Sequence, residues 1–95
     1  MSEGKLEKAC TSLVTKLGGV YRKLDVGPGA KGWCDLAIWL PGGKHLLVEL
    51  KVVANVMSRF QEHRAEEFSR LGFTVREIRS LEQFVRLLRE MGVMV

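Results

Sequence analysis

Three charged residues lie within two neighbouring apolar runs of this sequence. The first run, GWCDLAIWL, contains Asp35, and the second, KHLLVELKV, contains Glu49 and Lys51. A charge in a buried strand is costly unless an opposite charge or a metal ion offsets it. Two carboxylates beside one ammonium group need more positive charge, and their hard oxygens suit Mg²⁺ or Mn²⁺. Such an ion can activate water and stabilise negative charge that builds on a phosphate.

The segment between the two runs decides whether the carboxylates can meet. Pro41-Gly42-Gly43 predicts a hairpin turn, and a three-residue loop would pair Leu40 with Lys44. Counting back from that pair places Asp35 opposite Glu49, on the same side of the sheet. A two-residue loop would shift the pairing by one residue and separate the two carboxylates unless a bulge compensated.

A plainer interpretation of the same residues stays open at this point. Glu49 and Lys51 can be an exposed ion pair on an edge strand, and Asp35 can be a turn residue after the glycine-rich segment. An E-x-K triplet in an apolar strand is too short to specify a nuclease site by itself.

The elements that must position these residues follow from hydrophobic periodicity and turn signals. Ser58 with Gln61, and Ser80 with Gln83, fit capping boxes at the starts of two helices. The residues 26–32, VGPGAKG, predict a loop. The expected order is α-β-β-β-α-β-α, over residues 3–17, 20–25, 33–40, 44–53, 57–71, 73–78 and 80–91.

Composition places the chain among small globular domains. Its 95 residues, 46% hydrophobic and 27% charged, predict a single domain over residues 1–95. The expected order of elements makes this an α/β domain with a mixed four-stranded sheet flanked by helices. The net charge of +4 is compatible with an anionic partner. Cys10 and Cys34 form no zinc motif. The polar start and the lack of a run of about 20 apolar residues predict a cytoplasmic protein with no membrane partner.

The complete set of motifs is more specific than any of its parts. An aspartate, about a dozen residues and then E-x-K is the signature of the PD-(D/E)xK nuclease superfamily. The segments KLEKACTSLVTKLGG, GWCDLAIWLPGGKHLLVELK, SRFQ and LGFTVREIRSLEQF occur in the order and spacing of the VRR-NUC family, the virus-type replication-repair nucleases. The chain resembles this family over about residues 3–88.

The resemblance implies a restriction-endonuclease-like core with a metal site on its second and third strands. Asp35 and Glu49 would hold Mg²⁺ or Mn²⁺, assisted by the backbone carbonyl of Leu50. Lys51 would be the catalytic lysine.

Four further residues are candidates with ordinary alternatives. Glu7 matches an acidic residue that the first helix of the family contributes to the site, but it also fits a surface glutamate. Gln61 matches the family glutamine that opens the helix after E-x-K, and it equally fits the capping box of Ser58. We predict nucleic-acid contacts for Lys31 and Ser58, which otherwise fit a solvated loop charge and a helix cap.

Two departures from the family pattern stand close to the predicted site. The family commonly has proline before the aspartate, where this chain has Cys34. Cysteine can adopt the same extended backbone, so we expect the geometry to survive. The segment VVANVM, residues 52–57, replaces a connection that contains glycine, and we expect it to shape substrate access.

The resemblance implies a metal-dependent, structure-selective endodeoxyribonuclease that hydrolyses DNA phosphodiesters. Free-standing relatives are typically phage or bacterial proteins, and some are similar to Holliday-junction resolvases that act as homodimers on branched DNA. We expect Trp39, Phe73 and Met94 at a subunit contact. Two alternatives are an inactive nucleic-acid-binding module and a nuclease for flaps, nicked duplex or RNA.

Overall fold

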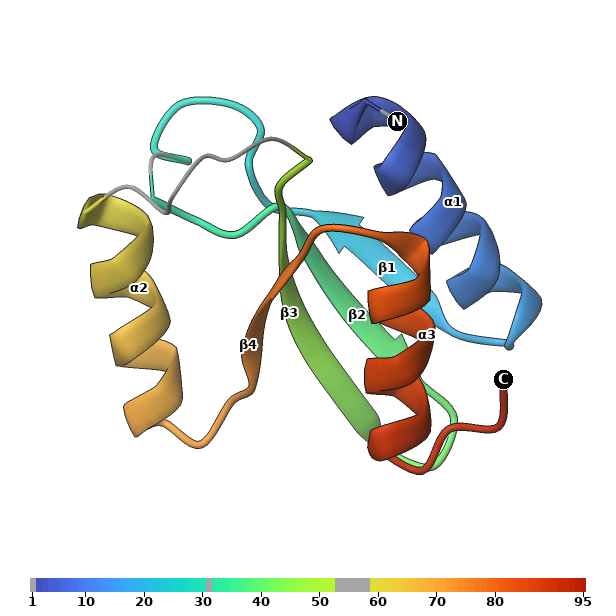
Figure 1. The fold of residues 1–95 in the computed structure, drawn as a ribbon. Helices are drawn as coiled ribbons and strands as arrows, with labels where there is room; N and C mark the ends of the chain where they lie inside the picture. The colour runs from blue at the N-terminus through green and yellow to red at the C-terminus, as the bar shows by residue number, and fades with distance from the viewer. Residues whose placement is uncertain (1, 31, 53–58) are drawn as a thin grey trace.

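The computed structural model describes residues 2–30, 32–52 and 59–95. A four-stranded mixed sheet forms its centre, and helices flank both faces (Figure 1). This is the predicted fold class and element order. The elements are α1 (Glu3–Lys16), β1 (Val20–Lys23), β2 (Leu36–Leu40), β3 (Lys44–Leu50), α2 (Arg59–Arg70), β4 (Val75–Ile78) and α3 (Leu81–Glu90).

The sheet has the strand order β1-β2-β3-β4, and its register decides the hairpin question. β2 pairs antiparallel with both β1 and β3, whereas β3 pairs parallel with β4. Leu40 pairs with Lys44, so the turn between β2 and β3 has three residues. Of the two loop lengths that the sequence left open, the structure has the three-residue loop, and the register carries Asp35 toward Glu49.

One face of the sheet packs against α1 and α3 and forms the core. Side chains alternate along each strand, so every second residue of β2 and β3 points into this layer. The fully apolar cluster includes Leu6, Cys10 and Val14 of α1, Phe84 and Leu88 of α3, and Leu36, Ile38, Leu40, Leu46, Val48, Leu50 and Ile78 of the sheet.

The opposite face is only partly covered, by α2 beside β4 (Figure 1). None of the residues of α2 is buried. Phe68 anchors this helix through ring contacts with Trp33 at 5.5 Å and with Phe73 at 6.4 Å between centroids. The apolar runs of the hairpin are typical of strands buried on both faces, and this expectation is wrong at Trp39, which is 49% exposed.

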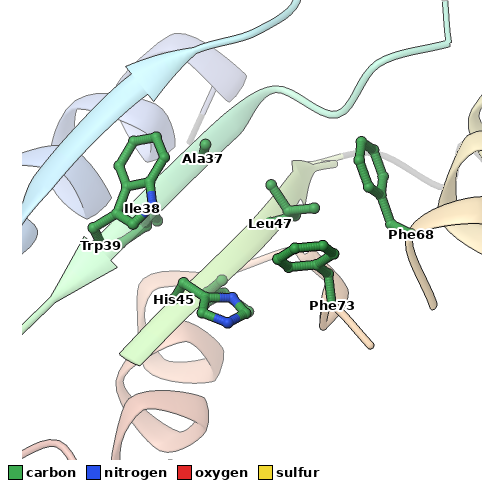
Figure 2. A pocket seen from close by; sticks show the side chains of 8 residues that line it. Ala37, Ile38, Trp39, His45, Leu47, Phe68 and Phe73 are labelled. Atoms are coloured by element: carbon green, nitrogen blue, oxygen red, sulfur yellow. The ribbon is translucent and has the colours of Figure 1, made fainter. Parts of the chain in front are cut away.

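An apolar groove of about 180 Å³ lies on this open face (Figure 2). Trp39 stands at one end and Phe68 at the other, and the rings of His45 and Phe73 lie between them, 5.2 Å apart between centroids, beside Leu47. None of the helices in the described ranges is long and apolar enough to cross a membrane.

Element ends differ from the predicted ranges at the site. The hairpin strands are shorter than expected, because Asp35 lies just before β2 and Lys51 just after β3. The predicted cap at Ser80 is confirmed, since its hydroxyl accepts a hydrogen bond from the Gln83 N–H at 3.1 Å. The Gln83 side chain in turn accepts from the Arg79 N–H at 2.7 Å.

Gly32 lets the loop before β2 pass closely under the start of α2. Its φ is +86°, and a Cβ there would lie 2.9 Å from the Cβ of Phe60. Gly29 has a similar φ of +81° but open space around it. We therefore expect Gly32→Ala to cost more than the roughly 1–2 kcal/mol of a left-handed alanine, and Gly29→Ala to cost only that.

Chemical denaturation of the two glycine variants checks this difference. Equal losses in the free energy of unfolding would mean that the close approach to Phe60 contributes nothing.

Candidate active site

Glu49 is the buried centre of the candidate site. It lies on β3 with only 1% of its surface exposed. One carboxylate oxygen, Oε1, accepts a hydrogen bond from Gln61 Nε2 at 2.6 Å and lies 3.6 Å from Lys51 Nζ. The other oxygen, Oε2, is buried and receives no hydrogen bond from any described residue. A buried carboxylate oxygen left without a donor is costly, so this atom requires an explanation.

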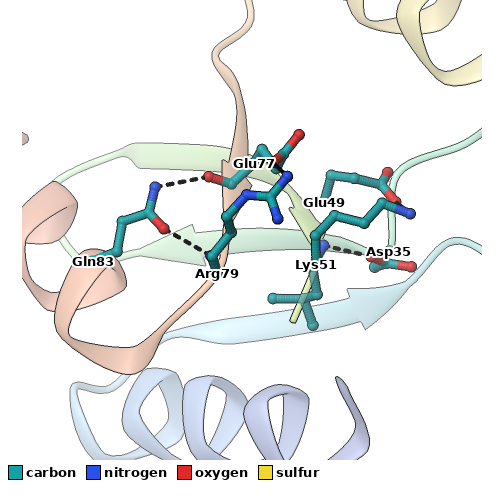
Figure 3. A network of polar contacts seen from close by, with 7 residues as sticks. Asp35, Glu49, Lys51, Glu77, Arg79 and Gln83 are labelled. Carbon is teal, nitrogen blue, oxygen red and sulfur yellow. Dashed lines mark hydrogen bonds and ion pairs between the residues drawn. The ribbon is translucent and has the colours of Figure 1, made fainter. Parts of the chain in front are cut away.

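Asp35 reaches the same place from the neighbouring strand. The backbone N–H of Leu50 donates to Asp35 Oδ2 at 2.6 Å, which fixes the carboxyl against β3 (Figure 3). The Asp35 and Glu49 carboxyl groups lie close enough to influence each other's pKa. The side chain of Asp25, in the loop after β1, also contacts Asp35.

Lys51 supplies the positive charge at this point. Its backbone N–H donates to the carbonyl of Ile78 at 3.0 Å, so β4 fixes the chain just beyond β3. Its side chain is 16% exposed, and its ammonium group faces Glu49. The structure therefore brings Asp35, Glu49, Lys51 and Gln61 together, which excludes the plainer interpretation of an exposed edge pair.

Burial disturbs the proton affinities of both acidic groups. Desolvation, followed by the contact with Asp25, raises the pKa of Asp35 to about 8. Desolvation also raises the pKa of Glu49, although the neighbouring Lys51 charge opposes that shift. Without additional positive charge, Asp35 favours its protonated form at neutral pH.

The raised pKa of Asp35 predicts that the metal-free protein loses stability as pH rises. The carboxyl ionises near its ordinary value of 3.8 in the unfolded chain and near 8 in the folded protein. The resulting stabilisation is complete below about pH 4 and is lost as the pH approaches about 8. We therefore expect the Tm in EDTA of Asp35→Asn to rise relative to wild type between these pH values. A pH-independent difference would contradict this prediction.

A polar cavity of about 210 Å³ opens beside Asp35 and includes Glu7. Glu7 forms an ion pair with Lys23 at 3.3 Å between Oε2 and Nζ. Sequence reasoning missed Lys23 and Asp25 at this site. The rarity of aspartate was the available signal, because Asp25 and Asp35 are the only two in the chain. The cavity is lined by Glu3, Gly4, Glu7, Lys23, Asp25, Asp35 and Leu50.

The remaining sequence candidates are placed less fully. Lys31 and Ser58, the predicted nucleic-acid contacts, lie outside the described residues, as does most of the VVANVM segment. Cys34 is buried, and burial raises the pKa of its thiol to about 11, so the thiol stays protonated at neutral pH. With Cys34 in place of the family's proline, Asp35 still lies next to Glu49 and accepts the hydrogen bond from Leu50.

The residues present fit a divalent metal ion with oxygen ligands. Asp35 and Glu49 offer carboxylates, and Leu50, which lines the adjoining cavity, offers its carbonyl. No three His, Cys, Asp or Glu side chains within the described ranges are gathered closely enough to hold a metal by themselves. The unpaired Oε2 of Glu49 nevertheless marks a position where a cation would satisfy a buried anion.

Known proteins are similar to this chain in sequence and in fold. No protein-family model matches it. It is 34% identical over 73 residues to "Putative nuclease p44" of Acyrthosiphon pisum secondary endosymbiont phage 1, covering 77% of each chain. A solved structure described as "VRR_NUC domain" superposes with a TM-score of 0.79 at 32% identity, covering 92% of this chain and 94% of the other. The chain therefore belongs to the VRR-NUC family of nuclease domains.

Proposed function

We propose that this protein is a Mg²⁺- or Mn²⁺-dependent endodeoxyribonuclease that hydrolyses phosphodiesters in branched DNA. The observation that carries the proposal is the buried Glu49 carboxylate, which has one oxygen without a donor and contacts Asp35. Membership in a family of nuclease domains supports phosphodiester hydrolysis as the reaction.

Each residue of the site has a role that its position supports. Asp35, Glu49 and the Leu50 carbonyl would hold the ion, which when bound lowers the pKa of water and polarises the phosphate. Lys51 is placed to donate to a phosphate oxygen as negative charge builds on it. Gln61 holds Glu49 in position through its 2.6 Å hydrogen bond.

Glu7 supports a wider site that extends across the polar cavity. Because Lys23 already neutralises it, Glu7 adds little net charge beside Asp35. The ion pair instead joins α1 to the end of β1 beside this cavity.

A homodimer completes the proposal, because symmetric cutting of a four-way junction requires two sites related by a two-fold axis. Trp39 and Phe73 are exposed at the groove on the open sheet face, which supports a subunit contact there (Figure 2). Met94 is also exposed, near the end of the chain. Sedimentation velocity should give about twice the chain mass of 10.7 kDa.

A panel of DNA substrates tests the function directly. The purified protein is incubated with labelled four-way junction, flap, nicked duplex, single strand and linear duplex, and with RNA, in Mg²⁺ or in EDTA. We expect paired symmetric incisions in the junction with Mg²⁺ and none in EDTA.

Other outcomes would favour the alternative functions. Preferential cutting of flaps, nicked duplex or RNA would replace the substrate but keep the chemistry. Binding to the junction without cleavage in Mg²⁺ or Mn²⁺ would identify a nucleic-acid-binding module. Cleavage that persists in EDTA would exclude the metal.

A further inference from the structure

Asp25 lies beside the proposed metal position, although it is not part of the motif formed by Asp35, Glu49 and Lys51. The Leu24 N–H donates to the carbonyl of Asp35 at 3.0 Å, just beyond the paired residues of β1 and β2. This hydrogen bond sets residue 25 against Asp35, and the two side chains line the same polar cavity. Their carboxyl groups are in contact.

Three acidic groups in this position need a cation. Asp25, Asp35 and Glu49 carry three negative charges when ionised, and Lys51 carries one positive charge. The remaining two negative charges equal the charge of one divalent ion. Glu7 and Lys23 leave this balance unchanged because they pair with each other.

An independent feature points to the same ligand. Oε2 of Glu49 is buried, lacks a donor among the described residues and belongs to a carboxyl that contacts Asp35. A neutral ligand would leave two negative charges uncompensated, whereas a divalent cation satisfies the unpaired oxygen and the excess charge together.

We propose that Asp25 is a third acidic group of the ion site and that it acts on the ion's hydration shell. Direct ligation by three side chains does not match the described geometry, in which no three such groups are gathered around one point. Mg²⁺ keeps several waters when it binds protein carboxylates, and an outer carboxylate accepts hydrogen bonds from them. Asp25 therefore ties the loop after β1 to ion binding. This inference rests on the proposed metal dependence.

Titration calorimetry with MnCl₂ alone, in the absence of DNA, tests the role of Asp25 in the full chain. We expect Asp25→Asn to bind Mn²⁺ at least about 10-fold more weakly than wild type, which is the usual loss for an outer carboxylate partner. Glu3→Gln is the matched control, because Glu3 lines the same cavity and loses the same charge. It should bind Mn²⁺ within about twofold of wild type.

Thermal unfolding in EDTA separates an ion-binding role from a structural one. The amide that replaces the Asp25 carboxylate can still accept a hydrogen bond from the protonated Asp35 carboxyl. Asp25→Asn should therefore keep the metal-free Tm while gaining less from Mn²⁺. A lower Tm in EDTA together with weaker Mn²⁺ binding would overturn the inference in favour of a packing role.

The remaining outcomes separate this inference from the proposed function. Wild-type Mn²⁺ affinity in Asp25→Asn, with binding lost in Asp35→Asn, would overturn the role of Asp25 alone. Failure of the wild-type protein to bind Mn²⁺ would overturn the metal dependence and this inference together.

Discussion

Asp35→Asn is expected to abolish DNA cleavage, with a fall of at least about 10³-fold in the single-turnover rate, while DNA binding remains within a few-fold of wild type. The asparagine oxygen can still accept the hydrogen bond that Leu50 donates at 2.6 Å, so the hairpin keeps its geometry. The lost charge removes one of the two carboxylates that would hold the ion. A barrier change of several kcal/mol corresponds to this loss in rate.

Quenched-flow cleavage and fluorescence anisotropy on the same labelled junction measure the two properties. Glu82→Gln is the matched control, because Glu82 is exposed on α3, away from the site, and loses the same charge. Retained cleavage in Asp35→Asn would remove the basis for a metal site in this hairpin.

Lys51→Met is expected to lower the cleavage rate by about 10²–10³-fold without weakening the binding of the metal ion. The ammonium group lies 3.6 Å from Glu49 and is largely shielded from solvent, so its charge acts strongly on nearby atoms. Its removal deprives the phosphate of a donor when negative charge develops. The same removal eliminates repulsion toward a divalent ion, so Mn²⁺ affinity should stay equal or increase.

The opposite effects on rate and affinity distinguish Lys51 from a residue that only supports the fold. Lys16→Met, on the exposed side of α1, should change neither quantity. Parallel losses of rate and Mn²⁺ affinity would show that Lys51 mainly holds Glu49 in place.

The hairpin was predictable because its information is local. Pro41-Gly42-Gly43 limits the loop to two or three residues, and for each length the strand period of two determines which residues meet. The same reasoning could not place Asp25, because its approach to Asp35 depends on how a glycine-rich loop returns to the sheet. No periodicity reports that path.

The sequence also could not predict how far the sheet face beneath α2 is buried. Trp39 lies in a continuous apolar run, which predicts cover on both sides, yet α2 reaches only the part of the sheet near β4. The apolar residues Phe60 and Leu71 of the predicted helix remain exposed in the same way. A pattern of apolar residues states that a surface avoids water but does not identify which element covers it.

The three-residue turn between β2 and β3 also restricts how this chain can diverge. Unless a bulge or a longer loop absorbed the change, inserting or deleting one amino acid there would reverse the inside-outside parity of one strand, so folding and chemistry would fail together. The length of the glycine-rich stretch before β2 does not determine which side of the sheet a residue faces. Lengthening it costs only a small loop-closure entropy. Descendants of this sequence can therefore vary the length of that stretch while the turn keeps its length.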